Sequence, residues 1–154
     1  MSTDERTAMT TEESTMNTDK TTLPEPAPSV WPSVGFTDID AGIHLLTEVL
    51  GFVITAIHRD DDGTVQHAEA RRPDGGGVMF GSRGKPGEWG ALGATGVYVV
   101  AADVAGVEAA WERAQAADDV EVTTPLTQQP YDPATFSVRD RDGNLWSVGT
   151  YRGE

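Results

Sequence analysis

The sequence predicts an α+β fold in which two consecutive βαβββ units form paired, curved mixed sheets around a concave pocket. The first observation is an internal repeat, in which residues 71–81 match residues 139–149 at a constant spacing of 68. The leading arginine, the Asp-Gly pair and the final glycine coincide in the two copies. The second observation is that the same order of elements, a strand, an aspartate-capped helix and then strands, leads into each copy. Neither unit could bury its sheet alone, so we expect the two to pack together.

The first unit is predicted to span residues 29–81. Its helix begins after Asp38, a residue type that caps helix N-termini, and ends before Gly51, which tolerates the positive φ of a helix C-terminus. Between them the apolar residues recur at helical spacing and define one buried face, namely Ile39, Ile43, Leu46 and Leu50. Around this helix we expect strands over residues 30–36, 52–59, 65–71 and 78–81, with turns at 60–63 and 74–75.

The second unit is predicted to span residues 95–152, after a glycine-rich linker at residues 82–94. Asp103 caps its helix, which runs to about residue 117. Trp146 alternates with Ser147 on the last strand, so its side chain should face the core. We expect the helix to bury Val104, Val107, Trp111 and Ala114. Strands are expected over residues 95–101, 120–126, 135–139 and 145–150, with a loop at 128–133.

Residues 1–28 differ in composition from the rest of the chain. They are rich in Thr, Ser and acidic residues, carry six acids against two bases, and end in a proline-rich segment. Too few apolar side chains are present there to offset the entropy lost when a chain becomes ordered. We therefore expect a disordered acidic N-terminal tail in front of a globular domain at residues 29–152.

The net charge of the 154-residue chain is -14. So acidic a surface is unsuited to nucleic acid or to anionic lipid, whose phosphates attract Lys and Arg. It suits solubility, or a cationic ligand. We expect neither a transmembrane helix nor a secretory leader, because no apolar run approaches roughly 20 residues and the N-terminus is polar. The absence of cysteine fits the reducing cytoplasm, where we expect the protein to act.

Three short segments carry a resemblance to a known family. They are Asp38-Ile39-Asp40 before a helix that ends Val49-Leu50-Gly51-Phe52, then His67-Ala68-Glu69-Ala70, and finally Asp142-Gly143-Asn144-Leu145-Trp146-Ser147. In the order and spacing of these segments, residues 29–152 resemble the vicinal oxygen chelate superfamily, which includes glyoxalase I, extradiol dioxygenases and bleomycin-resistance proteins. They are most similar to its PhnB-like branch. The resemblance implies the glyoxalase/bleomycin-resistance fold and a homodimer, with the units paired within one chain or swapped between two.

The resemblance also implies where a metal ion would be held. Metal-dependent members bind one divalent ion in the concave site, through His, Gln or Glu side chains of the first and last strands of each unit. Here the first-strand positions fall on Trp31 and Val97, and the last-strand positions on Met79 and Ser147. None of these side chains offers the imidazole or carboxylate donors that such ions need. We therefore expect no family-type metal site and no cofactor.

His67 and Glu69 stand out among the polar residues. Residues i and i+2 of a strand point to the same side, so both side chains should lie on the concave face. There they could act as an acid–base pair, clamp a ligand, form half of a metal site, or be half-exposed strand residues that hydrogen-bond locally. The other two histidines, His44 and His58, are expected at the surface.

The concave pocket is expected to combine apolar and aromatic side chains with a few polar groups, as small-molecule sites do. Trp89 and Tyr131 lie on Gly- or Pro-rich loops, from which they could close the pocket as stacking lids or instead pack on a sheet edge. The strand residues predicted to line the pocket are Trp31, Ser33, His67, Glu69, Met79, Val97, Val99 and Ser147.

Three classes of function are compatible with these features. The first is a binding protein of the bleomycin-resistance type, which sequesters a small aromatic or cationic molecule without a metal ion. The second is an enzyme of the glyoxalase superfamily, a lyase, isomerase or dioxygenase, with a displaced metal site or none. The third is a regulatory module without a ligand, suggested only by the acidic tail. The lack of metal-ligand side chains at the expected positions favours the binding protein.

Overall fold

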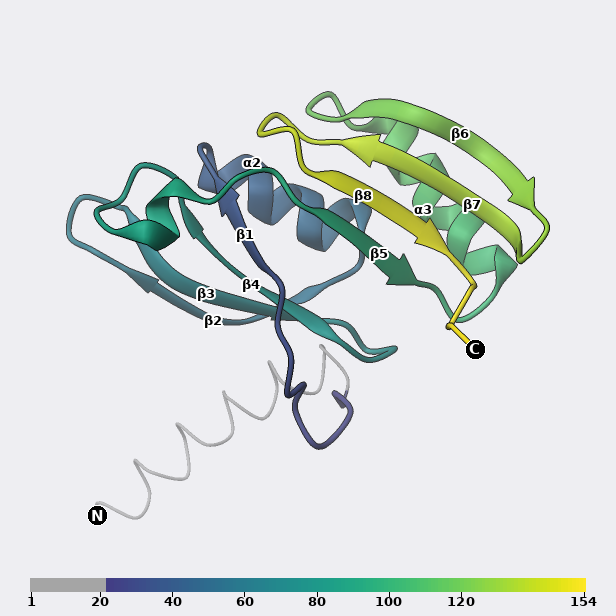
Figure 1. Ribbon diagram of the computed structural model, residues 1–154, viewed down its shortest axis with the longest axis horizontal. Helices are drawn as coiled ribbons and strands as arrows, with labels where there is room; N and C mark the ends of the chain where they lie inside the picture. Colours follow the sequence, from purple (N-terminus) through teal and green to yellow (C-terminus); the bar gives the residue numbers. More distant parts are fainter. Residues whose placement is uncertain (1–21) are drawn as a thin grey trace, which may run out of the picture.

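The computed structural model describes residues 22–154, which form two βαβββ units with one shared hydrophobic core (Figure 1). Most of the predicted tail lies outside the described residues. The first unit contains β1 (Ser33–Phe36), α2 (Ile39–His44), the π-helix η1 (Leu45–Val49), β2 (Val53–Arg59), β3 (Val65–Arg71) and β4 (Gly77–Ser82). A 3-10 helix, η2 (Glu88–Ala91), interrupts the linker. The second unit contains β5 (Gly96–Val100), α3 (Val104–Ala116), β6 (Glu121–Gln129), β7 (Asp132–Arg139) and β8 (Leu145–Gly149).

The strand order confirms the predicted pair of mixed sheets. The sheets have the orders β1-β4-β3-β2 and β5-β8-β7-β6, and in each the first strand pairs in parallel with the last. The internal repeat is visible in the strand register. Glu69 pairs with Met79 in the first unit, and the residues 68 positions later, Ser137 and Ser147, pair in the second. Each sheet carries its own helix on one face (Figure 1). Within residues 22–154, no helix is long and apolar enough to cross a membrane.

The first helix begins as predicted and then widens. The Asp38 side chain accepts a hydrogen bond from the Ala41 amide at 3.1 Å. After His44 the bonding changes to the π pattern, in which the amide of Leu50 reaches the carbonyl of Leu45 at 3.0 Å. The extra residue in the turn changes which side chains face the core. Ile43, which lies before the π turn, is only partly buried, and the buried apolar residues of this helix are Ile39, Leu45, Leu46, Val49 and Leu50.

Two predictions for the second unit are wrong. Val104 is 39% exposed, because it is the first residue of α3, where a side chain has fewer neighbours than in the middle of a helix. The helix buries Val107, Ala110 and Ala114, and Trp111 is partly buried. The expected loop at residues 128–133 is instead a tight hairpin turn between β6 and β7. Its prolines suggested a loop, but Pro130 lies in the turn itself and Pro133 is the second residue of β7, and both turns and the start of a strand tolerate proline.

The turn between β7 and β8 joins the two units. Asp140 accepts hydrogen bonds from the amides of Asp142 and Asn144 and, at 3.0 Å, from the indole nitrogen of Trp146. The fully buried Asn144 side chain accepts from the Thr95 amide at 3.0 Å and points its amide nitrogen toward the Gly35 carbonyl at 3.5 Å. The turn thereby connects the last strands of the second unit to the linker and to the first strand of the chain.

Two arginines reinforce this junction from the other side. Arg72 donates to the carbonyls of Leu50 and Val100, one in each unit, and its guanidinium lies 5.8 Å from the centre of the Phe52 ring. The Arg113 Nε donates to the Val49 carbonyl at 3.2 Å. Burial lowers the pKa of Arg72, a shift that the neighbouring Asp74 carboxylate opposes. The units therefore meet through buried polar contacts as well as through the apolar core.

Replacement of Asn144 by Ala tests the junction. We expect a loss of about 2 kcal/mol in the free energy of unfolding, because the partly buried Thr95 amide and the Asp140 carboxylate each lose a partner. Arg141→Ala in the same turn is the matched control, since the Arg141 side chain is 62% exposed and its contact with Asp38 is long. It should cost less than about 0.5 kcal/mol. Urea denaturation measures both, and equal losses would contradict the assigned role of Asn144.

Candidate functional site

The face of the first sheet that is turned away from the helix carries the half-exposed residues. On β3, Ala68 and Ala70 are fully buried against the helical side, whereas His67 and Glu69 alternate with them and lie on the other side. On β4 the same alternation buries Val78 and leaves Met79 half-buried. This open face is the concave surface that the sequence predicts for His67, Glu69 and Met79.

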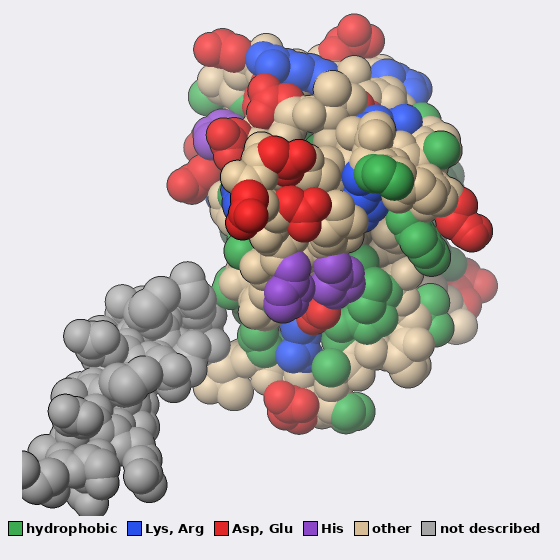
Figure 2. Space-filling view, turned by 90° about the vertical axis from the view of Figure 1, so that its left-hand side faces the viewer, with side chains coloured by type: hydrophobic (Ala, Val, Ile, Leu, Met, Phe, Trp, Pro, Cys, Tyr) green, Lys and Arg blue, Asp and Glu red, His purple; other side chains and the backbone are tan. Residues whose placement is uncertain are grey.

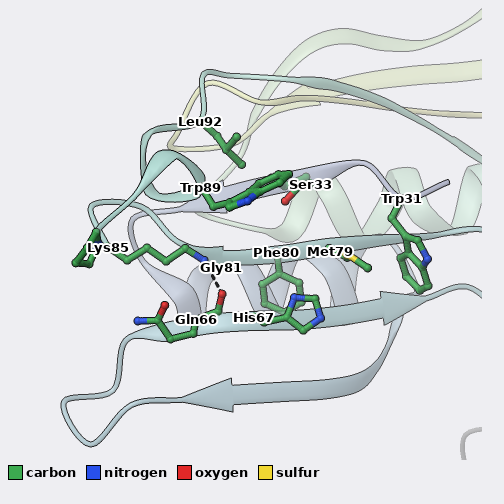
Figure 3. A pocket seen from close by; sticks show the side chains of 12 residues that line it. Trp31, Ser33, Gln66, His67, Met79, Phe80, Gly81, Lys85, Trp89 and Leu92 are labelled. Atoms are coloured by element: carbon green, nitrogen blue, oxygen red, sulfur yellow. Dashed lines mark hydrogen bonds between the residues drawn. The ribbon is translucent and has the colours of Figure 1, made fainter.

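A hollow of about 380 Å³ lies on this open face, within the size range of small-molecule sites. Its walls come from three sources, the segment that leads into β1, the strands β1, β3 and β4, and the linker after β4. In Figure 3 the side chain of Trp89 extends from the linker over the sheet, and Trp31 stands at the other end. The residues that line it include Trp31, Ser33, His67, Met79, Lys85 and Trp89.

Two histidines and a glutamate form a polar strip beside the hollow. The His67 Nε2 lies 2.8 Å from a carboxylate oxygen of Glu69. The ring of His58, on the adjacent strand β2, stacks on that of His67 with centroids 6.0 Å apart. Figure 2 shows two histidines side by side on this flank, with acidic side chains gathered above them. The strip is solvent-accessible, so its ionic contact stabilises the fold little, and its position at the hollow is the more informative feature.

Val97 and Val99 do not lie on the concave face of the second sheet, contrary to the prediction. Val97 pairs with the buried Trp146 and Val99 pairs with the buried Val148, so both face the core. Tyr98 takes the concave position, paired with Ser147. The error arose because β5 is apolar throughout, so its sequence does not show which side chains alternate toward the core.

The concave face of the second unit carries a hydrogen-bonded cluster. The carboxylate of Asp132 is 1% exposed and accepts from the Tyr98 hydroxyl and, at 3.0 Å, from the Thr150 amide. Burial, followed by the hydrogen bond to Asp132, raises the pKa of Tyr98 to about 12. Gly149 allows this arrangement, because a Cβ there would lie 2.2 Å from both oxygens. The Ser137 and Ser147 hydroxyls are 2.6 Å apart on the same face.

The structure does not bring the predicted residues of the two units into one pocket. Among residues 22–154, the hollow is lined by the first unit and the linker alone. Ser147 lies on the concave face of the second sheet, outside the hollow. Tyr131 is 62% exposed and packs edge-on against Tyr151, also outside the hollow. The chain therefore presents two separate open faces.

The side chains at the expected metal positions do not fit a divalent ion. The register places Ser33 beside Met79 in the first unit and Tyr98 beside Ser147 in the second. Hydroxyl and thioether groups lack the donor strength of imidazole or carboxylate for Zn²⁺ and similar ions. Within the described residues, no group of three His, Cys, Asp or Glu side chains is arranged to hold a metal ion.

The sequence prediction missed Lys85, Gln66 and Leu92 in the hollow, and Tyr98 and Asp132 on the second face. Lys85 and Leu92 belong to the linker, whose path over the sheet is set by tertiary packing rather than by a periodic pattern. The sequence signal for Lys85 is that this lysine stands among the glycines of the linker. For Asp132, the Tyr-Asp-Pro segment was visible but was interpreted as a loop.

The comparisons with known proteins agree with this fold. The family model for the Glyoxalase/Bleomycin resistance protein/Dioxygenase superfamily matches residues 31–148. TioX from Micromonospora sp. ML1 is 26% identical with a TM-score of 0.62, over 82% of this chain and 98% of that one. A PhnB protein from Bacillus cereus is 16% identical with a TM-score of 0.52, and the match covers 80% of this chain and 99% of that one. Lactoylglutathione lyase from Agrobacterium tumefaciens is 19% identical with a TM-score of 0.55, and the match covers 81% of this chain and 96% of that one. At this identity the similarity shows the fold alone. No curated protein matches the chain.

The Tyr98 network predicts a pH dependence of stability. The folded-state pKa of about 12 lies above the ordinary value of 10, so the folded chain keeps the phenol proton at pH values where the unfolded chain has lost it. The stability that results is fully present below pH 10 and is lost as the pH rises from 10 to 12. Denaturation of the wild type and of Tyr98→Phe across this range should show a steeper fall for the wild type. Parallel curves would contradict the network.

Proposed function

The chain belongs to the glyoxalase/bleomycin resistance protein/dioxygenase superfamily, and on that basis we propose that it binds and sequesters a small aromatic molecule. The ligand would occupy the hollow over the first sheet, without the metal ion of metal-dependent relatives. The observation that carries the proposal is the pair Trp31 and Trp89, which reach the same hollow from separate segments of the chain.

The exposure of Trp89 supports an aromatic ligand. This side chain is 60% exposed, although a tryptophan gains much from burial and Trp146 is fully buried in the same chain. Met79 on the sheet below offers a polarisable thioether that adapts to flat ring systems. A planar molecule that contacts Trp31, Trp89 and Met79 would bury apolar surface of all three side chains, and this burial would favour binding.

The surroundings of the hollow favour an aromatic ligand over a cationic one, the two options that the sequence left open. The cationic option rests on the net charge of -14, which is a property of the whole chain. Glu69, the acidic group nearest to the hollow's His67, is already hydrogen-bonded to that histidine. An aromatic ring, in contrast, has specific partners in the hollow.

A catalytic role is the alternative, and the His67–Glu69 contact of 2.8 Å is the observation in its favour. A carboxylate that orients an imidazole at the edge of a pocket is an arrangement found in general acid–base catalysis. An isomerase or lyase of this kind would lose turnover in His67→Gln while ligand affinity changed little. A sequestering protein would show no turnover in either form.

We further propose that the protein acts in the cytoplasm as a homodimer. The concave face of the second unit, with Tyr98, Ser137 and Ser147, is open in the single chain and lies outside the hollow. Members of this superfamily often complete their concave sites with two chains. In such a dimer the second unit of one protomer would face the hollow of its partner.

Ligand binding tests the role of the tryptophans. With planar dyes such as quinoline and naphthalene derivatives, calorimetry should show binding to the wild type and a loss of about tenfold in affinity in Trp31→Ala or Trp89→Ala. Tyr131→Ala is the control, because Tyr131 is exposed but outside the hollow. Equal effects of all three substitutions, or no binding to the folded wild type, would refute the proposed site.

The dimer proposal is tested with a substitution on the second face. Ser147→Arg should weaken dye binding several-fold if a partner's second unit faces the hollow, although Ser147 does not line the hollow within its own chain. Glu108→Arg on the exposed side of α3 is the control. Sedimentation equilibrium should give twice the chain mass of 16.4 kDa. A monomer, or unchanged binding in Ser147→Arg, would contradict the shared site.

A further inference from the structure

We propose that the ligand of the hollow is an aromatic acid, whose carboxylate is held by Lys85. This inference rests on the proposed function and specifies its ligand class. It comes from the charge inside the hollow rather than from that of the whole chain. Among the described residues that line the hollow, Lys85 is the one Lys or Arg, and no Asp or Glu accompanies it.

The ammonium group of Lys85 is positioned to accept a ligand. It donates one hydrogen bond to the carbonyl oxygen of Gln66, at 2.5 Å, as the dashed line in Figure 3 shows. An ammonium has three N–H donors, so two are left for a ligand oxygen. Two acids on this flank hold hydrogen bonds of their own, since Glu69 contacts His67 and Asp60 accepts from the Gln66 side-chain amide at 2.7 Å, and neither lines the hollow.

Two glycines create the space that Lys85 occupies. A Cβ at Gly81, on β4, would lie 2.5 Å from the Lys85 Nζ, so a larger residue there would displace the ammonium from this position. A Cβ at Gly90 would lie 1.8 Å from the Lys85 carbonyl oxygen. The linker is closed on itself by a hydrogen bond from the Gly84 amide to the Gly90 carbonyl, at 2.8 Å. Local packing thus fixes where the lysine enters the hollow.

The chemistry of the lining distinguishes an acid from an amine. A carboxylate beside Lys85 would form a charge-assisted hydrogen bond, which is about twice as strong as a neutral one. An ammonium ligand would instead meet a like charge, and no carboxylate among the lining residues would offset it. The tryptophans bind the ring in either case, so the charged group alone sets the preference.

A matched set of naphthalene ligands tests the inference. We would titrate the full chain with 2-naphthoate, 2-naphthamide and 2-naphthylmethylammonium, which share one ring system and differ in charge. The wild type should bind the acid about tenfold more tightly than the amide, and the amine most weakly. Lys85→Met should bind acid and amide equally while its affinity for the amide stays at the wild-type value. Lys85→Arg should keep the preference for the acid.

The control is Arg141→Gln, which removes one positive charge from the exposed junction turn and should leave the acid preference intact. A wild type that binds all three ligands equally would overturn the assignment of Lys85 but not the aromatic site. The same holds if the acid preference persists in Lys85→Met. If none of the three ligands binds to the folded chain, both the proposed function and the proposed ligand class are wrong.

Discussion

The hydrogen bonds of Asp140 and Asn144 hold the β7–β8 turn in shape at a place where the two units meet. Asn144 is fully buried, and its side chain connects the β7–β8 turn to the linker at Thr95 and to β1 at Gly35. The internal repeat places Arg72 at the position of Asp140 in the first unit, and Arg72 bonds across the junction to the Val100 carbonyl. The matching turns of the two units thus both place polar side chains at the junction, and such partly buried polar contacts are costly to rearrange.

The two units have different surfaces although their folds match. The linker that follows β4 crosses the open face of the first sheet and brings Lys85 and Trp89 over it. The second unit has no such covering segment among the described residues, and its open face is filled instead by the Tyr98–Asp132 network. One repeat therefore has a hollow with aromatic walls, and the open face of the other carries a hydrogen-bonded network. The proposed dimer would bring these two surfaces together.

The sequence predicted the fold well because its signals are local. Asp38 and Asp103 cap both helices, and the spacing of 68 residues carries the strand register of one unit onto the other. The site was predicted less completely. His67 and Met79 alternate with small or apolar core residues and could be placed on a face, whereas Val97 and Val99 lie in an apolar strand without such a contrast. Lys85 reaches the hollow from the linker, whose path over the sheet no periodic pattern reveals.

The central claim is that an aromatic ligand binds over the first sheet, and the four tryptophans of the chain allow a direct test. Trp31 and Trp89 line the hollow, whereas Trp111 packs against Phe136 and Trp146 is buried in the core. Titration of ¹⁵N-labelled protein with 2-naphthoate, followed through the indole N–H signals, should shift Trp31 and Trp89 and leave Trp111 and Trp146 in place. Shifts confined to Trp111 and Trp146, or no shift at saturating ligand, would contradict the account.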